Sequence, residues 1–280
     1  MVDLLGAVDV RELAARLDVT PTKKLGQNFV TDPNTIRRIV AAAKLSGSEI
    51  VVEIGPGLGS LTLGLLEVAK KVIAVEIDPK MAAELESTIS KRAPGTDFTL
   101  VRDDALRVAT LPADPDALVA NLPYNISVPV LLHFLEHFPT IQTGLVLVQA
   151  EVAHRLAAEP GSKISGIPSV KLAWYADSAL AGNVGRNIFW PAPNVDSALV
   201  YFSKRAVPLG DEQLRIATFD VADAAFGQRR KTLRQALATW AGSPADAERI
   251  LISAGVSPQA RGEELDVHQF VAIARARNGK

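Results

Sequence analysis

The stretch "VVEIGPGLGSLT", residues 51–62, decides the fold. It opens with a continuous apolar, β-branched run, which is typical of a short strand buried on both faces. Gly55, Gly57 and Gly59 follow at alternate positions, and glycine permits the positive φ angles and close ligand approach of a strand-to-helix turn. The spacing is GxGxG rather than the GxGxxG of dinucleotide enzymes, so an ordinary tight turn explains it equally well.

The pattern alternates between strand and helix on both sides of this turn. We expect further strands over residues 71–78, 98–104, 117–121 and 143–149, and "SVKLAWYADSALA" (169–181) and "DSALVYFSK" (196–204) are interpreted as two late strands. Expected helices cover about 10–18, 34–44, 58–69, 79–92 and 128–137. Asp9 and Glu12 resemble a capping box for the first helix, and Asp32 or Asn34 caps the second. Strands that alternate with helices predict an α/β fold with a mostly parallel, doubly wound sheet.

The end of the chain has a different pattern. A linker is expected over 204–213, and the remaining residues are helical with breaks at glycine and proline. We therefore predict a larger α/β domain over residues 1–206, with an N-terminal helical extension, and a small helical domain over 207–280.

Composition restricts the class of protein. The 280 residues are 48% hydrophobic and 22% charged, with no cysteine, which indicates a globular protein without disulfides or thiolate metal sites. No apolar run is long enough to span a bilayer and no signal peptide is evident, so a cytoplasmic location is expected. Net charge is −1, but residues 20–44 and 226–240 are locally basic. Either stretch could be a solvated helix face or a nucleic-acid contact.

Acidic residues end the second and third expected strands. Glu76 lies about 20 residues after the glycine turn, where an acid can accept hydrogen bonds from both hydroxyls of a ribose. NAD enzymes share that geometry, so the pair predicts an adenosine-type cofactor without naming it. Asp104 could accept from the amino group of an adenine ring, or it could cap a helix.

The fourth expected strand ends in "NLPY", residues 121–124. The side-chain oxygen of Asn121 and the backbone carbonyl of Leu122 could each accept one hydrogen of an adenine N6 amine, favouring a pyramidal nitrogen whose lone pair is aimed at an electrophilic methyl group. Pro123 would fix the turn, and Tyr124 would stack on the base. This chemistry needs positioning and electrostatics rather than a general base. Alternatively, Asn121 caps a turn and Tyr124 packs in the core, but acids and glycines at matching strand ends favour the functional interpretation.

These motifs support a resemblance. "NLPY" is similar to the [DNS]-[IVLP]-P-[YFW] motif of amino-group methyltransferases that use S-adenosylmethionine. The chain as a whole resembles the small-subunit ribosomal RNA adenine N6,N6-dimethyltransferases, the kasugamycin-sensitivity family. The matching segments, in chain order, are "KKLGQNFV", "VVEIGPGLGSLT", "VIAVEID", "DDAL", "NLPYNIS", "FWPAPNVDSALV" and "AFGQRRKTLRQAL".

The resemblance implies a Rossmann-like methyltransferase domain followed by a small all-α domain. It implies that S-adenosylmethionine is held by Asn28, Val30, Gly55, Gly57, Glu76, Asp104 and Asn121. Tyr124 and Phe189 would sandwich the target adenine, beside the acceptors of Asn121 and Leu122. The family usually has leucine where Val30 stands. The target base must be flipped out of its stem-loop, and RNA stem-loops are bound mainly through their phosphates and shape. The residues that would contact the RNA are Lys23, Lys24, Arg229, Arg230, Lys231 and Arg234.

The implied substrate is two adjacent adenines near the 3′ end of small-subunit rRNA, in an immature 30S particle, and we expect a monomer. Three alternatives remain open: a large-subunit dimethyltransferase of the erythromycin-resistance type, a non-enzymatic assembly factor, and an NAD enzyme. The run "FGQRRKTLR" favours the small-subunit type over the first of these. His133 and His137 are spaced i, i+4 on a helix, but no third ligand is evident and no metal is expected.

Overall fold

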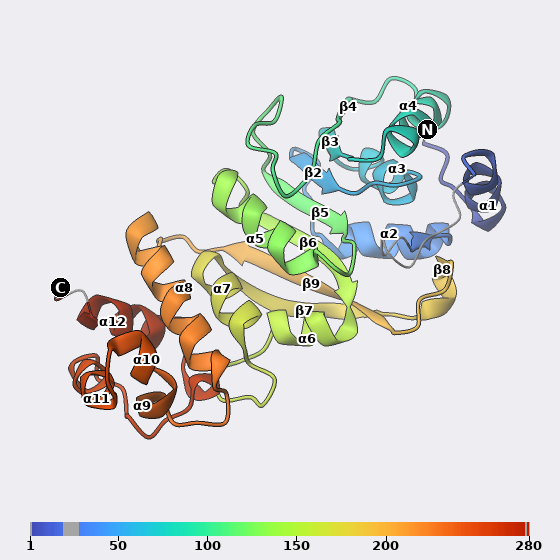
Figure 1. Cartoon of the computed structure of the whole chain (residues 1–280). Coiled ribbons are helices and arrows are strands. Elements are labelled where there is room, and N and C mark those ends of the chain that lie inside the picture. The colour runs from blue at the N-terminus through green and yellow to red at the C-terminus, as the bar shows by residue number, and fades with distance from the viewer. Residues whose placement is uncertain (1, 19–27, 278, 280) are drawn as a thin grey trace. The chain divides into compact units, whose positions relative to one another are not determined.

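The structure is a computed structural model that describes residues 2–18, 28–277 and 279 (Figure 1). Its α-helices are α1 (Ala7–Arg16), α2 (Pro33–Ala42), α3 (Ser60–Leu66), α4 (Pro79–Arg92), α5 (Ser127–His137), α6 (Ala150–Leu156), α7 (Ile167–Tyr175), α8 (Glu212–Gly227), α9 (Leu233–Ala236), α10 (Ala238–Ala241), α11 (Pro244–Ser253) and α12 (Val267–Arg277). Short 3₁₀ turns cover Arg186–Ile188 and Gly262–Glu264. Its strands are β1 (Phe29–Val30), β2 (Ile50–Ile54), β3 (Lys71–Val75), β4 (Phe98–Val101), β5 (Ala117–Asn121), β6 (Thr143–Gln149), β7 (Ala176–Val184), β8 (Phe189–Trp190) and β9 (Ser197–Lys204).

Seven of these strands form one sheet in the order β4-β3-β2-β5-β6-β9-β7. The first five in this order pair in parallel, and β9 is antiparallel to β6. This confirms the predicted α/β fold with a mostly parallel sheet. The parallel strands bring their carboxyl ends to one edge, which is where ligands bind in open sheets of this kind.

The central strands are buried on both faces, as their apolar runs predict. Val51 and Val52 in β2 and Val72 and Ile73 in β3 have no exposed surface. Helix α2 packs so closely on α3 that a Cβ atom on Gly64 would lie 2.3 Å from Cγ2 of Ile36. A larger residue at that position would push α2 away from α3.

The first two helices begin differently from each other. Helix α1 starts at Ala7, three residues before the predicted start, and Asp9 lies in its first turn, where its carboxylate accepts from the Gly6 N–H at 2.7 Å. Asp32, rather than Asn34, caps α2. Its carboxylate accepts from the Thr35 N–H at 2.9 Å and from the Thr35 hydroxyl at 2.6 Å, and the hydroxyl bond lowers the pKa of Asp32.

One predicted strand is wrong in its first half. Residues 169–175 of "SVKLAWYADSALA" belong to helix α7, and strand β7 begins only at Ala176. Val170 and Trp174, one helical turn apart, are buried in a core that also contains Val221 of α8. Pro168 in the first turn of α7 is compatible with a helix start, so packing and local chemistry agree on the helix.

The chain divides into two compact units. The first holds residues 1–153 and 179–204, and the second holds 154–178 and 205–280. Segment 154–178, which the predicted boundary at 206/207 assigns to the α/β domain, therefore packs with the C-terminal helices. The second unit has its own core, which includes Leu233, Leu237 and Phe270, each without exposed surface. The predicted all-α C-terminal region is confirmed.

Candidate active site

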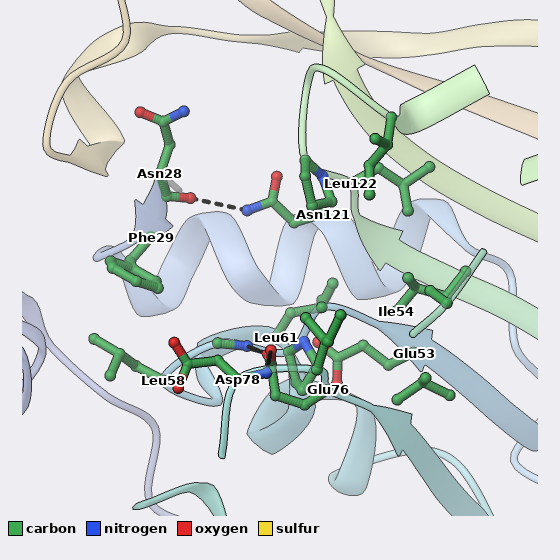
Figure 2. Close-up of a pocket in the computed structure, with 18 of the residues that line it drawn as sticks. Asn28, Phe29, Glu53, Ile54, Leu58, Leu61, Glu76, Asp78, Asn121 and Leu122 are labelled. Carbon is green, nitrogen blue, oxygen red and sulfur yellow. Dashed lines mark hydrogen bonds between the residues drawn. The ribbon is translucent and has the colours of Figure 1, made fainter. Parts of the chain in front are cut away.

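A cavity of about 400 Å³ lies at the carboxyl edge of the parallel strands, within the first unit (Figure 2). It is lined by residues that follow β2, β3, β4 and β5, and by the segment around β1. The sequence predicted that these strand ends converge. Gly55, Gly57, Glu76, Asp104 and Asn121 all line this one cavity, together with Asn28, Val30, Leu122 and Tyr124.

The glycine turn has the backbone geometry that its sequence indicates. Gly55, Gly57 and Gly59 have φ angles of +63°, +55° and +92°, a region that favours glycine. A Cβ atom on Gly57 would lie 2.7 Å from Cε1 of Phe29, so this position also lacks room for a side chain. The turn therefore holds the start of α3 against the cavity without side chains of its own.

Glu76 directly follows β3 and is 7% exposed. Its carboxylate accepts from the backbone N–H groups of Gly57 at 3.2 Å and Asp78 at 2.9 Å (Figure 2). Burial raises the pKa of Glu76, while these two hydrogen bonds oppose the shift. The carboxylate is thus fixed beside the glycine turn and retains lone pairs that can accept from hydroxyl groups.

Asp104 caps a local turn in this structure. Its Oδ1 atom accepts from the Leu106 N–H at 2.9 Å, and its Oδ2 atom lies 3.7 Å from Nε of Arg107. This is a cap on a turn rather than on a helix, because no helix lies in the described segment between β4 and β5. Because Asp104 also lines the cavity, its role toward an adenine amino group stays a prediction.

Asn121 is the last residue of β5, and its side chain is oriented by a distant part of the chain. Its Nδ2 atom donates to the backbone carbonyl of Asn28 at 3.0 Å, which Figure 2 shows as a dashed line. Because the amide nitrogen is engaged, the amide oxygen is the atom available to accept from a substrate amine. The turn that follows approaches the glycine turn, since a Cβ atom on Gly55 would lie 3.7 Å from the Pro123 ring.

Tyr124 lines the cavity and is anchored by its hydroxyl. The Oη atom lies 2.6 Å from the Oγ atom of Ser197, a fully buried residue at the start of β9. Burial raises the pKa of Tyr124, so the phenol is neutral at physiological pH. The ring is therefore fixed at the cavity wall, where a planar base can stack on it.

Phe189 occupies a different environment from Tyr124. It is 4% exposed, pairs with Val30 across the β1–β8 ladder, and packs in the core of the first unit. It is not among the described residues that line the cavity. Its role in a sandwich around the adenine stays a prediction.

Glu53 and Ile77 are among the cavity residues that the sequence reasoning missed. Glu53 is 1% exposed, and its Oε2 atom has no hydrogen-bond partner among the described residues. Burial raises the pKa of Glu53 to about 8; the Thr62 hydroxyl opposes this shift and the nearby Glu76 carboxylate adds to it. Ile77 is 66% exposed, although it lines the cavity. Glu53 could have been recognised as an acid two residues before the first glycine, and Ile77 as an apolar residue between the two acids of "VEID".

The basic residues of the second unit fall into two classes. Arg229 pairs with Glu263 at 3.0 Å and Arg234 with Glu248 at 2.8 Å, so both are engaged within the protein. Arg230 and Lys231 are exposed, and neither forms an ion pair within the described part of the chain. Lys23 and Lys24, which were also predicted to contact RNA, lie outside the described residues.

The two histidines of α5 contact the backbone. Nε2 of His133 lies 2.8 Å from the Val108 carbonyl oxygen, and Nδ1 of His137 lies 3.0 Å from the His133 carbonyl oxygen. Within residues 2–18, 28–277 and 279, no group of three or more histidine or acidic side chains is arranged to hold a metal ion. None of the helices in that same part of the chain has the length and apolar composition needed to cross a bilayer.

Comparison with known proteins decides among the possible cofactors. The sequence model for "Ribosomal RNA adenine dimethylase" matches residues 20–278. The chain belongs to this family. Members transfer methyl groups from S-adenosylmethionine, so the chain is an rRNA adenine N6,N6-dimethyltransferase and S-adenosylmethionine is its cofactor.

Individual relatives agree with this assignment. "Ribosomal RNA small subunit methyltransferase A" of Arthrobacter sp. (strain FB24) is 59% identical over 279 residues, covering 99% of this chain and 94% of the relative. The protein of the same name from Streptomyces coelicolor is 60% identical over 274 residues, covering 97% and 96%.

Solved structures show the same fold. A dimethyladenosine transferase from Plasmodium falciparum matches with a TM-score of 0.74 at 25% identity, covering 88% of this chain and 95% of that one. The 23S rRNA methyltransferase ErmE matches with a TM-score of 0.66 at 27% identity, covering 90% and 100%.

The cavity residues fit S-adenosylmethionine. The ribose diol needs acceptors, which Glu76 supplies, and the adenine ring needs an apolar surface, which Ile77 exposes. The cofactor also carries positive charge, and the unpartnered Oε2 atom of Glu53 is a buried acceptor that a cationic group would satisfy.

Proposed function

We propose that this chain dimethylates the N6 amines of two adjacent adenines near the 3′ end of small-subunit rRNA, within an immature ribosomal particle. The family assignment and the names of relatives that are about 59% identical support the small-subunit substrate. The observation that carries the chemistry is the 3.0 Å bond from Asn121 Nδ2 to the Asn28 carbonyl, because it orients the amide oxygen as an acceptor.

The amine of adenine needs activation, because its lone pair is delocalised into the ring. The amide oxygen of Asn121 and the carbonyl oxygen of Leu122 each accept one N6 hydrogen, which favours a pyramidal nitrogen. Leu122 is fixed for this task, since its N–H donates to the Leu147 carbonyl at 3.1 Å and its side chain is buried. The bound cofactor would supply an electrophilic methyl group attached to a cationic sulfur.

Tyr124 contributes a stacking surface for the flipped base. Its hydroxyl is held by Ser197, so the ring loses little freedom when the base arrives. Base–aromatic stacking is worth about 1–3 kcal/mol, which offsets part of the cost of taking the base out of its helix. No general base is required, because the methylated amine is acidic enough to release its proton to water.

RNA binding is proposed for the exposed cations of the second unit, Arg230 and Lys231, which are free to meet phosphates. Lys23, Lys24, Arg229 and Arg234 remain sequence predictions in this respect. We further propose that the protein acts as a monomer in the cytoplasm, which size-exclusion chromatography with light scattering and cell fractionation can check.

The function is tested with labelled S-adenosylmethionine and immature small subunits from cells that lack the protein. We expect label on N6 of two adjacent adenines, located by mapping modified positions near the 3′ end of the rRNA. Large subunits from the same cells serve as the matched control and remain unlabelled. Label on the large subunit would favour the erythromycin-resistance type, and tight particle binding without any transfer would favour an assembly factor.

A further inference from the structure

The segment between α6 and α7 is tied to two distant parts of the second unit. The Gly161 N–H donates to the Glu263 carbonyl at 2.8 Å, and Nη2 of Arg229 donates to the Lys163 carbonyl. Arg229 in turn pairs through Nε with Oε2 of Glu263 at 3.0 Å. We call residues 159–166 the loop, and Arg229 with Glu263 the clip. The loop sequence, "EPGSKISG", contains glycine and proline and forms no regular element. Besides its internal turns and the Gly166–Ser169 bond, these contacts tie it to the rest of the second unit.

The clip residues are not arranged as RNA contacts. Their side chains are 39% and 21% exposed, and the Arg229 guanidinium already faces a carboxylate and a peptide oxygen. A phosphate would have to compete with both partners. Arg229 is thus engaged within the protein, in contrast to its neighbours Arg230 and Lys231.

Lys163 is brought to this place by the clip. Its carbonyl is bound by Arg229, so its backbone lies beside the residue that precedes Arg230 and Lys231 in sequence. Lys163 is exposed, and no ion pair engages it within the described part of the chain. The bond joins residues that are 66 positions apart in the sequence, and it brings the Lys163 backbone to the side chain that precedes Arg230 and Lys231.

We propose that Lys163 is an RNA-phosphate contact and that Arg229 and Glu263 are positioning residues that hold it beside Arg230 and Lys231. The proposal rests on the proposed function, because it adds a contact to the same RNA site. Three clustered cations meet successive phosphates of an RNA backbone better than two, and each phosphate neutralised releases counterions.

The Glu263→Ala variant separates this proposal from direct contact by Arg229. If the acid were only a charge near the RNA, removing it would leave binding unchanged or make it tighter, because it repels phosphate. If it holds the loop, its removal releases Lys163 and binding weakens. Weaker RNA binding by Glu263→Ala therefore supports the positioning role, and unchanged or tighter binding excludes it.

The experiment measures the affinity of the full-length protein for immature small subunits as a function of salt. For Lys163→Gln we expect about threefold to tenfold weaker binding and a salt slope that is smaller by about 0.7 to 0.9. For Glu263→Ala and Arg229→Gln we expect a similar rise in KM for the particle with kcat retained. Affinity for the free cofactor should be unchanged in all three variants.

Hydrogen exchange supplies the readout that links the clip to the loop. Amides of residues 159–166 should exchange faster in Glu263→Ala and Arg229→Gln than in the wild type. Arg234→Gln is the matched control. It also breaks an arginine–glutamate pair, at 2.8 Å with Glu248, but Arg234 donates to no loop carbonyl, so loop exchange should not change.

Two results would overturn the roles proposed for Lys163, Arg229 and Glu263. One is a Glu263→Ala variant that binds the particle as tightly as the wild type or more tightly. The other is a Lys163→Gln variant with an unchanged salt slope. A wild-type protein that transfers no methyl group to the particle would defeat the proposed function, and this proposal with it.

Discussion

Glu53 should make the stability of the protein depend on pH in a way that one substitution removes. The pKa of this carboxyl is about 8 in the folded protein, against an ordinary value of 4.5, because burial disfavours its charged form. Between these two values the native state holds a proton that the unfolded chain has released. The free energy of unfolding must therefore fall as pH rises through this window.

The magnitude follows from the two pKa values. Each pH unit inside the window contributes about 1.4 kcal/mol, so the wild type should lose about 3 to 4 kcal/mol between pH 5 and pH 8 through this group. Glu53→Gln does not titrate at this position, so its free energy of unfolding should not show this decrease. It should therefore be more stable than the wild type at pH 8 and close to it at pH 5.

The assay is urea unfolding of both proteins at several pH values, with the variant subtracted from the wild type at each one. The subtraction cancels every other titrating group that the substitution does not disturb. Parallel stability curves for the two proteins across this range would refute the reasoning. They would mean that Glu53 is ionised in the folded protein despite its burial.

Three further predictions concern the cavity. Bound S-adenosylmethionine would bring positive charge into the cavity that Glu53 lines, so binding should release protons between pH 6 and 8. Calorimetry in buffers of different ionisation enthalpy should show this release for the wild type and a smaller one for Glu53→Gln. Gly57→Ala should lower the free energy of unfolding through backbone strain of about 1–2 kcal/mol and a clash with Phe29. Gly95→Ala, at φ +80° with open space around it, should cost the strain alone, and equal losses of stability in urea unfolding would contradict this. Tyr124→Ala should lower kcat/KM for the particle by roughly 5- to 150-fold through lost stacking, while Tyr124→Phe keeps the ring and most of the activity; equal losses would assign the role to the hydroxyl.

The part of the site that could be predicted from sequence is the part that depends on local chemistry. Gly55, Gly57, Glu76 and Asn121 follow strands with clear apolar runs, and parallel strands must bring these ends together. The mostly parallel character of the sheet follows from this alternation, whereas the order of its strands was not predicted. Glu53 belongs to the same stretch, but its burial depends on how α3 packs over it, which no local pattern reveals.

Other features depend on partners far away in the sequence. The bond that orients Asn121 joins residues separated by 93 positions, and the pairs that engage Arg229 and Arg234 span 34 and 14 positions. Charge counting alone treats all four cations of "RRKTLR" alike. Residues 169–175 form a helix because Val170 and Trp174 meet a core built by later helices, so the local apolar pattern was ambiguous.

The proposed methyl transfer depends most directly on the side-chain amide of Asn121. The decisive measurement is single-turnover methyl transfer to immature small subunits by Asn121→Ala, with S-adenosylmethionine affinity measured on the same preparation. We predict a rate that falls by roughly 100- to 1000-fold, the usual cost of removing an oriented group that stabilises a transition state, with cofactor affinity changed far less. A variant that binds the cofactor and transfers methyl groups at the wild-type rate would contradict the account.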